Sequence, residues 1–144
     1  MKELQLLKYK YRLVLKHSYA TAWVIPHKKA LICELKGSYV PDEAFRDILL
    51  NVGVIVEQED SNIFILDRRQ SRVFHQDSME WYIVEWKKAM YDRGLVHYHE
   101  ILPKDEEWFR DALEAGCLQI REKYPQANDL LNIHYCSSVM EAFV

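Results

Sequence analysis

Apolar and polar residues alternate with a period of two in the first quarter of the chain. Residues 11–17 alternate around Leu13 and Leu15, which predicts a half-buried β-strand. Residues 19–25 are rich in aromatic and β-branched side chains, and residues 30–35 form an apolar run after a polar turn. Short connections join the three stretches, so we expect them to form an antiparallel meander.

The rest of the chain changes to a period of three to four residues, interrupted by short apolar runs. The spacing predicts three helices, with buried stripes at Phe45, Ile48, Leu49, Val52 and Val56, then at Met79, Tyr82, Ile83, Trp86 and Met90, and then at Phe109, Ala112, Leu113, Gly116, Cys117 and Ile120. Apolar runs at residues 62–67, 95–102 and 131–135 predict three further strands, and a short helix is expected at the end.

The expected order of elements is therefore βββαβαβαβα. Strands that alternate with helices of this length imply right-handed crossovers and a parallel sheet. The sequence predicts one α/β domain over residues 1–144. Its mixed β-sheet should combine an N-terminal antiparallel meander with parallel βαβ strands, and the helices should pack on that sheet.

Several residues occupy positions that start a helix. Pro41 and the acidic residues after it predict the start of the first helix, because proline fits the first turn and acidic groups complement the helix dipole. Asp77 and Glu80 have the spacing of a capping box, and Ser138 and Glu141 repeat that spacing near the end of the chain. The second helix should therefore open at Asp77 and the last one after Ser138.

Composition narrows the class of protein. The 144 residues fit one domain, with 49% hydrophobic and 28% charged residues. The net charge is -3 with both signs interspersed, so we expect no nucleic-acid partner. No signal region or apolar span is evident, so we expect a cytoplasmic protein without a membrane partner. Cys33, Cys117 and Cys136 are odd in number and far apart, which argues against disulfides and a zinc site.

No sequence motif points to catalysis. The chain contains neither a nucleophile elbow nor a glycine-rich phosphate loop. His97 and His99 flank Tyr98 on an expected strand, so both imidazoles share one face and could reach a common ion. A metal usually needs a third ligand, and packed or rim histidines are the alternative. We expect no catalytic residue, no cofactor and no bound metal; an enzyme that uses His97 or His99 is the third hypothesis.

Five segments follow one another in an order and spacing that resemble a known superfamily. They are ELKG at 34–37, VPDEAFR at 40–46, ILDRR at 65–69, QDSMEW at 76–81 and IHYCSSVMEAF at 133–143. Together they resemble the STAS-like, SpoIIAA-like superfamily of bacterial sulfate-transporter and anti-sigma-factor-antagonist domains.

The resemblance implies a mixed sheet with packed helices and a regulatory binding role. Several members of the superfamily bind a partner protein until a serine at a helix N-terminus is phosphorylated. The family pattern there is roughly Asp-Ser-Ser/Thr-Gly, and this chain has Asp77-Ser78-Met79-Glu80. Ser78 is the residue that could take the role of phospho-acceptor, in a place where a helix N-terminus favours phosphate.

A partner or ligand surface is expected around the loop that leads into the second helix. This loop contains Arg68, Arg69 and Arg72 and follows the buried strand expected at 62–67, at the edge where α/β sheets bind ligands. Trp81 lies beside the buried stripe of the second helix and could be partly exposed. A solvated loop and a tryptophan that covers the edge of the core are the alternatives. The candidate residues are Asp67, Arg68, Arg69, Arg72, Asp77, Ser78 and Trp81.

We therefore predict a non-catalytic regulatory or protein-interaction module, anti-sigma-antagonist-like in kind, whose partner is another protein. The alternative is a domain that binds a small anionic or lipid-like ligand at the carboxyl edge of the sheet. The free edge of the meander could also pair with a second copy and give a homodimer, since edge strands invite partners.

Overall fold

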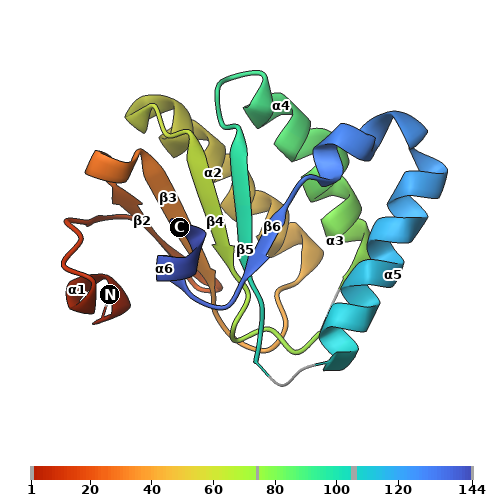
Figure 1. Ribbon diagram of the computed structural model, residues 1–144, viewed down its shortest axis with the longest axis horizontal. Helices are drawn as coiled ribbons and strands as arrows, with labels where there is room; N and C mark the ends of the chain where they lie inside the picture. Colours follow the sequence, from red (N-terminus) through yellow and green to blue (C-terminus); the bar gives the residue numbers. More distant parts are fainter. Residues whose placement is uncertain (1, 74, 105–106, 144) are drawn as a thin grey trace.

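Six strands form one mixed sheet in the computed structural model, which describes residues 2–73, 75–104 and 107–143. The strands lie in chain order across the sheet: β1 (Arg12–His17), β2 (Ala20–Ile25), β3 (Ala30–Leu35), β4 (Ile63–Asp67), β5 (His97–Ile101) and β6 (His134–Cys136) (Figure 1). β1 to β3 pair antiparallel, whereas β3 to β6 pair parallel. The predicted α/β class and mixed sheet are confirmed.

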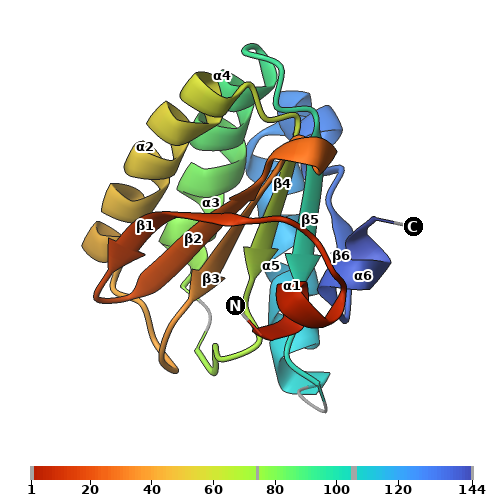
Figure 2. The same ribbon diagram turned by 90° about the vertical axis from the view of Figure 1, so that its left-hand side faces the viewer.

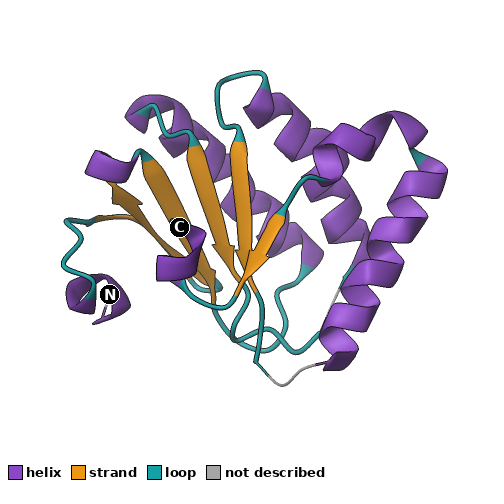
Figure 3. Cartoon of the chain, in the orientation of Figure 1, coloured by secondary structure: helices purple, strands orange, loops and turns teal. Residues whose placement is uncertain are grey.

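The helices that connect the parallel strands all cover one face of the sheet. α2 (Asp42–Glu59) leads from β3 to β4, and α5 (Glu107–Lys123) follows β5. Between β4 and β5 the chain passes through α3 (Gln76–Trp81), the π-helical segment η2 (Tyr82–Lys87) and α4 (Lys88–Tyr91). Figure 2 shows this helix layer on one side of the sheet, and Figure 3 separates helices from strands by colour.

Two short terminal helices cover part of the opposite face. α1 (Lys2–Leu6) and α6 (Val139–Ala142) are joined by a hydrogen bond from the Val139 N–H to the Glu3 carboxylate, 3.0 Å long. α1 has no counterpart among the predicted elements, because a helix of 5 residues shows too little periodicity to detect. Both helices complete a second apolar core with the sheet, made of Leu4, Ile25, Ala30, Ile32, Ile65, Ile101, Cys136, Val139 and Ala142.

In the larger core, α2 packs closely against the helix formed by α3, η2 and α4. The Trp86 indole N–H donates a hydrogen bond of 2.7 Å to the Leu49 carbonyl oxygen. A Cβ atom at Gly53 would lie 3.3 Å from the Met90 sulfur, so glycine allows the two helices to approach at this point. The Phe64 ring of β4 lies 5.1 Å from the Trp86 ring. These contacts fix the separation of the two helices.

The predicted helix starts are partly correct. The Ser138 hydroxyl accepts a hydrogen bond from the Glu141 N–H, so the expected cap of the last helix is confirmed. The capping box at Asp77 and Glu80 is wrong: α3 begins one residue earlier, and the His75 side chain accepts from the Ser78 N–H. Glu80 instead accepts hydrogen bonds from side chains of a distant segment, and these outcompete the local cap.

Lys87 is buried and attaches the segment before β6 to the helix layer. Its ammonium donates hydrogen bonds to the carbonyl oxygens of Leu130 and Asn132, at the end of the 3₁₀ helix η3 (Pro125–Leu131). This helix occupies the start of the strand expected at 131–135, so β6 begins only at His134. Burial lowers the pKa of Lys87 to about 8, although the negative charge of Glu100 acts in the opposite direction.

Within the described residues, none of the helices combines the length and apolar character that crossing a bilayer requires.

The pH dependence of stability should reveal the buried lysine. The folded-state pKa of about 8 lies below the ordinary value of about 10.4, so the unfolded chain binds more protons between these two values. The lysine therefore lowers the unfolding free energy at neutral pH, and this penalty disappears as the pH rises. Between about pH 7 and pH 9.5, the unfolding free energy of the wild type should rise by about 2 kcal/mol relative to that of Lys87→Met.

Urea titrations at several pH values would measure this difference. The buried thiols have raised pKa values and act in the opposite direction, but they are present in both proteins and cancel. Lys88→Met, at an exposed neighbouring position, serves as the matched control. The unfolding free energy of the wild type relative to Lys87→Met could change as little with pH as it does relative to Lys88→Met. Lys87 would then not be the desolvated ammonium that the structure shows.

Candidate functional site

The chain at the end of β4 directs successive side chains to opposite faces of the sheet. Asp67 and Arg69 lie on the face of α1, where Arg69 Nη2 is 2.7 Å from the carboxylates of both Asp67 and Glu3. Hydrogen bonding to Asp67 raises the pKa of Arg69. Arg68 turns to the helix face, as the alternation of a strand requires. The seven predicted surface residues therefore do not form one continuous patch.

Arg68 forms a buried ion pair with Glu100 of β5. Its Nε–H donates to the Glu100 carboxylate, and the guanidinium lies 5.7 Å from the centre of the Phe45 ring. Burial, and then the charge of Glu100, raise the pKa of Tyr82, whose hydroxyl has no hydrogen-bond partner among the described residues. Losing one member of such a pair leaves an uncompensated buried charge, so Arg68 holds β4 to β5 and is not available at the surface.

Ser78 connects the start of α3 to the start of α2. Its hydroxyl donates a hydrogen bond of 2.7 Å to Asp42, and its oxygen lies 3.0 Å from His75 Nδ1. Ser78 is only 6% exposed. Burial opposes ionisation of Asp42, but hydrogen bonds from Ser78 and Arg46 outweigh it and lower the pKa of Asp42. A kinase would reach Ser78 only after this contact opened, so its role as phospho-acceptor stays a prediction.

Two further predicted residues are held differently. The Arg72 guanidinium donates hydrogen bonds to the carbonyl oxygens of Arg69 and Ser71, 3.0 and 2.9 Å long, and so stiffens the loop. Asp77 is exposed, on the outer side of α3.

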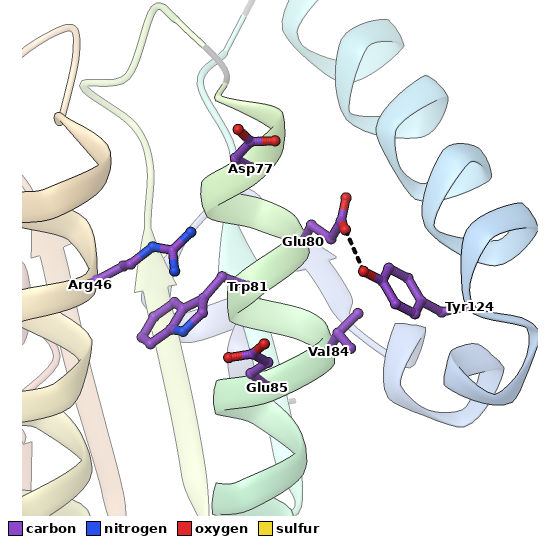
Figure 4. A pocket seen from close by; sticks show the side chains of 7 residues that line it. All are labelled: Arg46, Asp77, Glu80, Trp81, Val84, Glu85 and Tyr124. Atoms are coloured by element: carbon purple, nitrogen blue, oxygen red, sulfur yellow. Dashed lines mark hydrogen bonds between the residues drawn. The ribbon is translucent and has the colours of Figure 1, made fainter.

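Trp81 lines a depression between α2 and the helix that begins with α3. The Arg46 guanidinium stacks over its ring at 5.3 Å, and in Figure 4 Arg46 extends from α2 toward Trp81. Hollows of about 190 and 400 Å³ both include Trp81, and the smaller one extends to Tyr124. A third hollow of about 610 Å³, lined by residues 41–50 alone, adjoins them through Arg46 and Leu50. We call the depression the α2–α3 groove and define it by Arg46, Leu50, Val54, Trp81, Glu85 and Ala89.

The apolar part of the groove includes two residues that are not among the candidates predicted from the sequence. Leu50 and Val54 are 59% and 55% exposed, although both belong to a helix whose other side is core. They are four residues apart and therefore neighbours on the helix surface. A signal for them was present in the sequence, because both are large apolar residues outside the buried stripe of that helix.

Acidic residues surround the groove. Glu43, Asp77 and Glu85 line its hollows, and none of the three has a hydrogen-bond or ion-pair partner among the described residues. The cations of the groove are already paired, Arg46 with Asp42 and Arg93 with Glu57. The groove therefore combines apolar surface with carboxylates that lack a side-chain partner among the described residues.

A separate hollow of about 380 Å³ lies between α5 and β6. Leu102, Leu113 and Tyr135 supply apolar surface. Arg110 and Arg121 of α5 supply two positive charges against the one negative charge of Glu114. This hollow is the nearest counterpart of the anionic or lipid-like ligand site expected at the carboxyl edge of the sheet, since Leu102 follows the end of β5.

His97 and His99 share one face of β5, as predicted, but the close partner of His99 is His134. The Nδ1 atoms of His99 and His134 are 3.0 Å apart, and the two ring planes are inclined by 84°. Burial, and then the neighbouring histidines, lower the pKa of His99 to about 4. The described residues contain no group of three or more metal-ligating side chains.

No family model, curated protein or solved structure matches the chain. The site must therefore be interpreted from its own geometry.

The contact between Ser78 and Asp42 should be sensitive to charge. Ser78→Ala removes one hydrogen bond and should lower the unfolding free energy by about 1 kcal/mol. Ser78→Asp places a second carboxylate against Asp42 at a buried position and should lower it by roughly 2–4 kcal/mol. The loss should shrink at acidic pH, where the two carboxyl groups can share a proton.

Urea denaturation of both variants would measure these values. Ser18→Asp, in the exposed turn between β1 and β2, should change stability little and serves as the control for added charge. Equal stabilities for Ser78→Ala and Ser78→Asp would show that the start of α3 is not held against Asp42.

Proposed function

We propose that the chain is a non-catalytic protein-interaction module that binds a partner protein in the α2–α3 groove. The partner segment that fits is an amphipathic helix with one apolar stripe and basic residues beside it. The observation that carries this proposal is the exposure of Leu50 and Val54 next to Trp81, on helices that otherwise belong to the core.

The shape and apolar surface of the groove suit a helix. Leu50 and Val54 lie on one wall, and Trp81 and Ala89 lie on the other. Amphipathic helices commonly bind by placing their apolar face into a groove of this kind. A central tryptophan is typical of the positions that contribute most binding energy.

The charge of the groove indicates which helices would bind. Glu43, Asp77 and Glu85 are unpaired among the described residues, so a partner with Lys or Arg beside its apolar stripe would be attracted and oriented. An acidic segment would be repelled by the same carboxylates. Binding should therefore weaken as salt screens these exposed charges.

The resemblance to STAS-like domains supports a regulatory role. A phosphate on Ser78 would add negative charge beside Asp42, at the end of the groove where α2 and α3 begin. Repulsion there would separate the two helix starts and change the width of the groove. Modification of Ser78 would thus control partner binding without any catalytic step.

A small-ligand function is the second candidate, because the hollow between α5 and β6 combines apolar walls with Arg110 and Arg121. Its volume of about 380 Å³ lies within the range of small-molecule sites. A fatty acid has the matching chemistry, an acyl chain with one carboxylate. If it bound there, it would raise the melting temperature without competing for the α2–α3 groove.

Site-specific photo-crosslinking tests the groove directly. A photoreactive amino acid would replace Val54 in one variant and Leu118 of α5 in the other, which are 55% and 54% exposed. In the native cell, position 54 should give one discrete protein adduct and position 118 should give none. The crosslinked segment, sequenced by mass spectrometry, should be a basic amphipathic helix.

Charge reversal provides the second arm of this experiment. Glu85→Lys should reduce the position 54 adduct at least roughly tenfold, because it removes a carboxylate from the groove and repels a basic partner. Glu122→Lys, at an exposed position of α5, should leave the adduct unchanged. No adduct at position 54, an equal adduct at position 118, or an adduct indifferent to Glu85→Lys would contradict the proposal.

A further inference from the structure

A pair of histidines lies on the sheet face opposite the α2–α3 groove. His99 of β5 and His134 of β6 are directly paired in the parallel ladder, so both side chains emerge on the same face. On the other side of His99 the same row continues with Ile65 of β4. Both histidines therefore project from adjacent strands of the sheet, which hold them in place.

The distance between the two imidazoles fits a shared ion. Their Nδ1 atoms are 3.0 Å apart. Two nitrogens bound at about 2.05 Å to one metal lie about 2.9 Å apart at a right angle and about 3.4 Å apart at the tetrahedral angle. The observed separation matches neighbouring ligands in square-planar or octahedral geometry, which Cu²⁺ and Ni²⁺ adopt with nitrogen and oxygen ligands.

The surroundings leave room for the rest of a coordination shell. His134 is exposed and His99 is partly buried, so solvent reaches one side of the pair. The Glu141 carboxylate, fixed by a hydrogen bond of 2.9 Å from the Ser137 N–H, lies near enough to His134 to interact with its charge. A cation at the pair would therefore find negative charge close by and water for its open positions.

We propose that His99 and His134 bind one divalent transition-metal ion through their Nδ1 atoms, with water in the remaining positions. Without metal, one Nδ1–H donates to the other Nδ1 lone pair. The ion takes the place of that hydrogen, which moves to Nε2 of the same ring by exchange with solvent. His97, two residues earlier on the same face, pairs in the ladder with Ile63 and is not part of the site.

Titration with NiCl₂ of the full chain without an affinity tag tests this site. Ni²⁺ is preferable to copper as the probe, because Cys117 is a free thiol that would compete for copper. Isothermal titration should give one Ni²⁺ per chain. Because the second ligand acts intramolecularly, His134→Ala should weaken binding at least roughly tenfold.

Matched variants make the outcome decisive. His97→Ala removes a histidine from the same face and strand and should leave Ni²⁺ affinity unchanged, whereas His99→Ala should weaken it as much as His134→Ala. Circular dichroism would confirm that each variant is folded, and Ni²⁺ should broaden the NMR signals of His99 and His134 before those of His97. Binding that survives loss of both His99 and His134, or that His97→Ala reduces equally, would overturn the proposal.

Discussion

The handedness of the connections between parallel strands determines most of this structure. β4, β5 and β6 are each added on the same side of the strand before them. Right-handed crossovers in one continuing direction place every connecting helix on the same face of the sheet. α2, α3 and α5 must therefore lie side by side, and a groove between neighbouring helices follows directly. The opposite face receives no crossover helix and is left to the short terminal helices (Figure 2).

The same constraint explains why the two faces differ in chemistry. On the helix face the sheet must be apolar, and its buried charges, Arg68 and Glu100, neutralise each other. On the opposite face, α1 and α6 provide a second core with residues of β2 to β6. On the same face of β5 and β6, beside this core, lie three exposed or partly buried histidines, His97, His99 and His134. Polar side chains can remain there because solvent reaches them.

Local sequence signals predict the elements well, and they fail where distant residues compete. The strand at 30–35 is observed as predicted, because its apolar run depends only on neighbouring residues. Glu80 has the spacing of a helix cap, yet it binds Lys123 and Tyr124, which are 43 and 44 residues away along the chain. No local pattern contains that information. By comparison, the placement of Arg68 and Arg69 on opposite faces of the sheet follows from strand alternation alone.

The two proposed sites differ in how much of each can be predicted from the sequence. The sequence points to Trp81 as a surface residue, and Leu50 and Val54 carry the same signal as apolar residues outside a buried stripe. The partner of His99 could not be found in this way, because it depends on the register of β5 against β6. In addition, η3 shortens the expected last strand, so that only residues from His134 onward pair with β5.

The groove is held by two different kinds of contact, and under the proposed regulation this difference decides where a change in charge would act. Along the middle of α2, Gly53 fits against Met90 of α4 and the Leu49 carbonyl accepts a hydrogen bond from Trp86 of η2. Added surface charge would not disturb these contacts. Where α2 and α3 begin, the contact is polar and joins Ser78 to Asp42. A fixed groove lowers the entropy cost of binding. A charge added at Ser78 would therefore act on the polar contact, and the apolar contact would serve as its hinge.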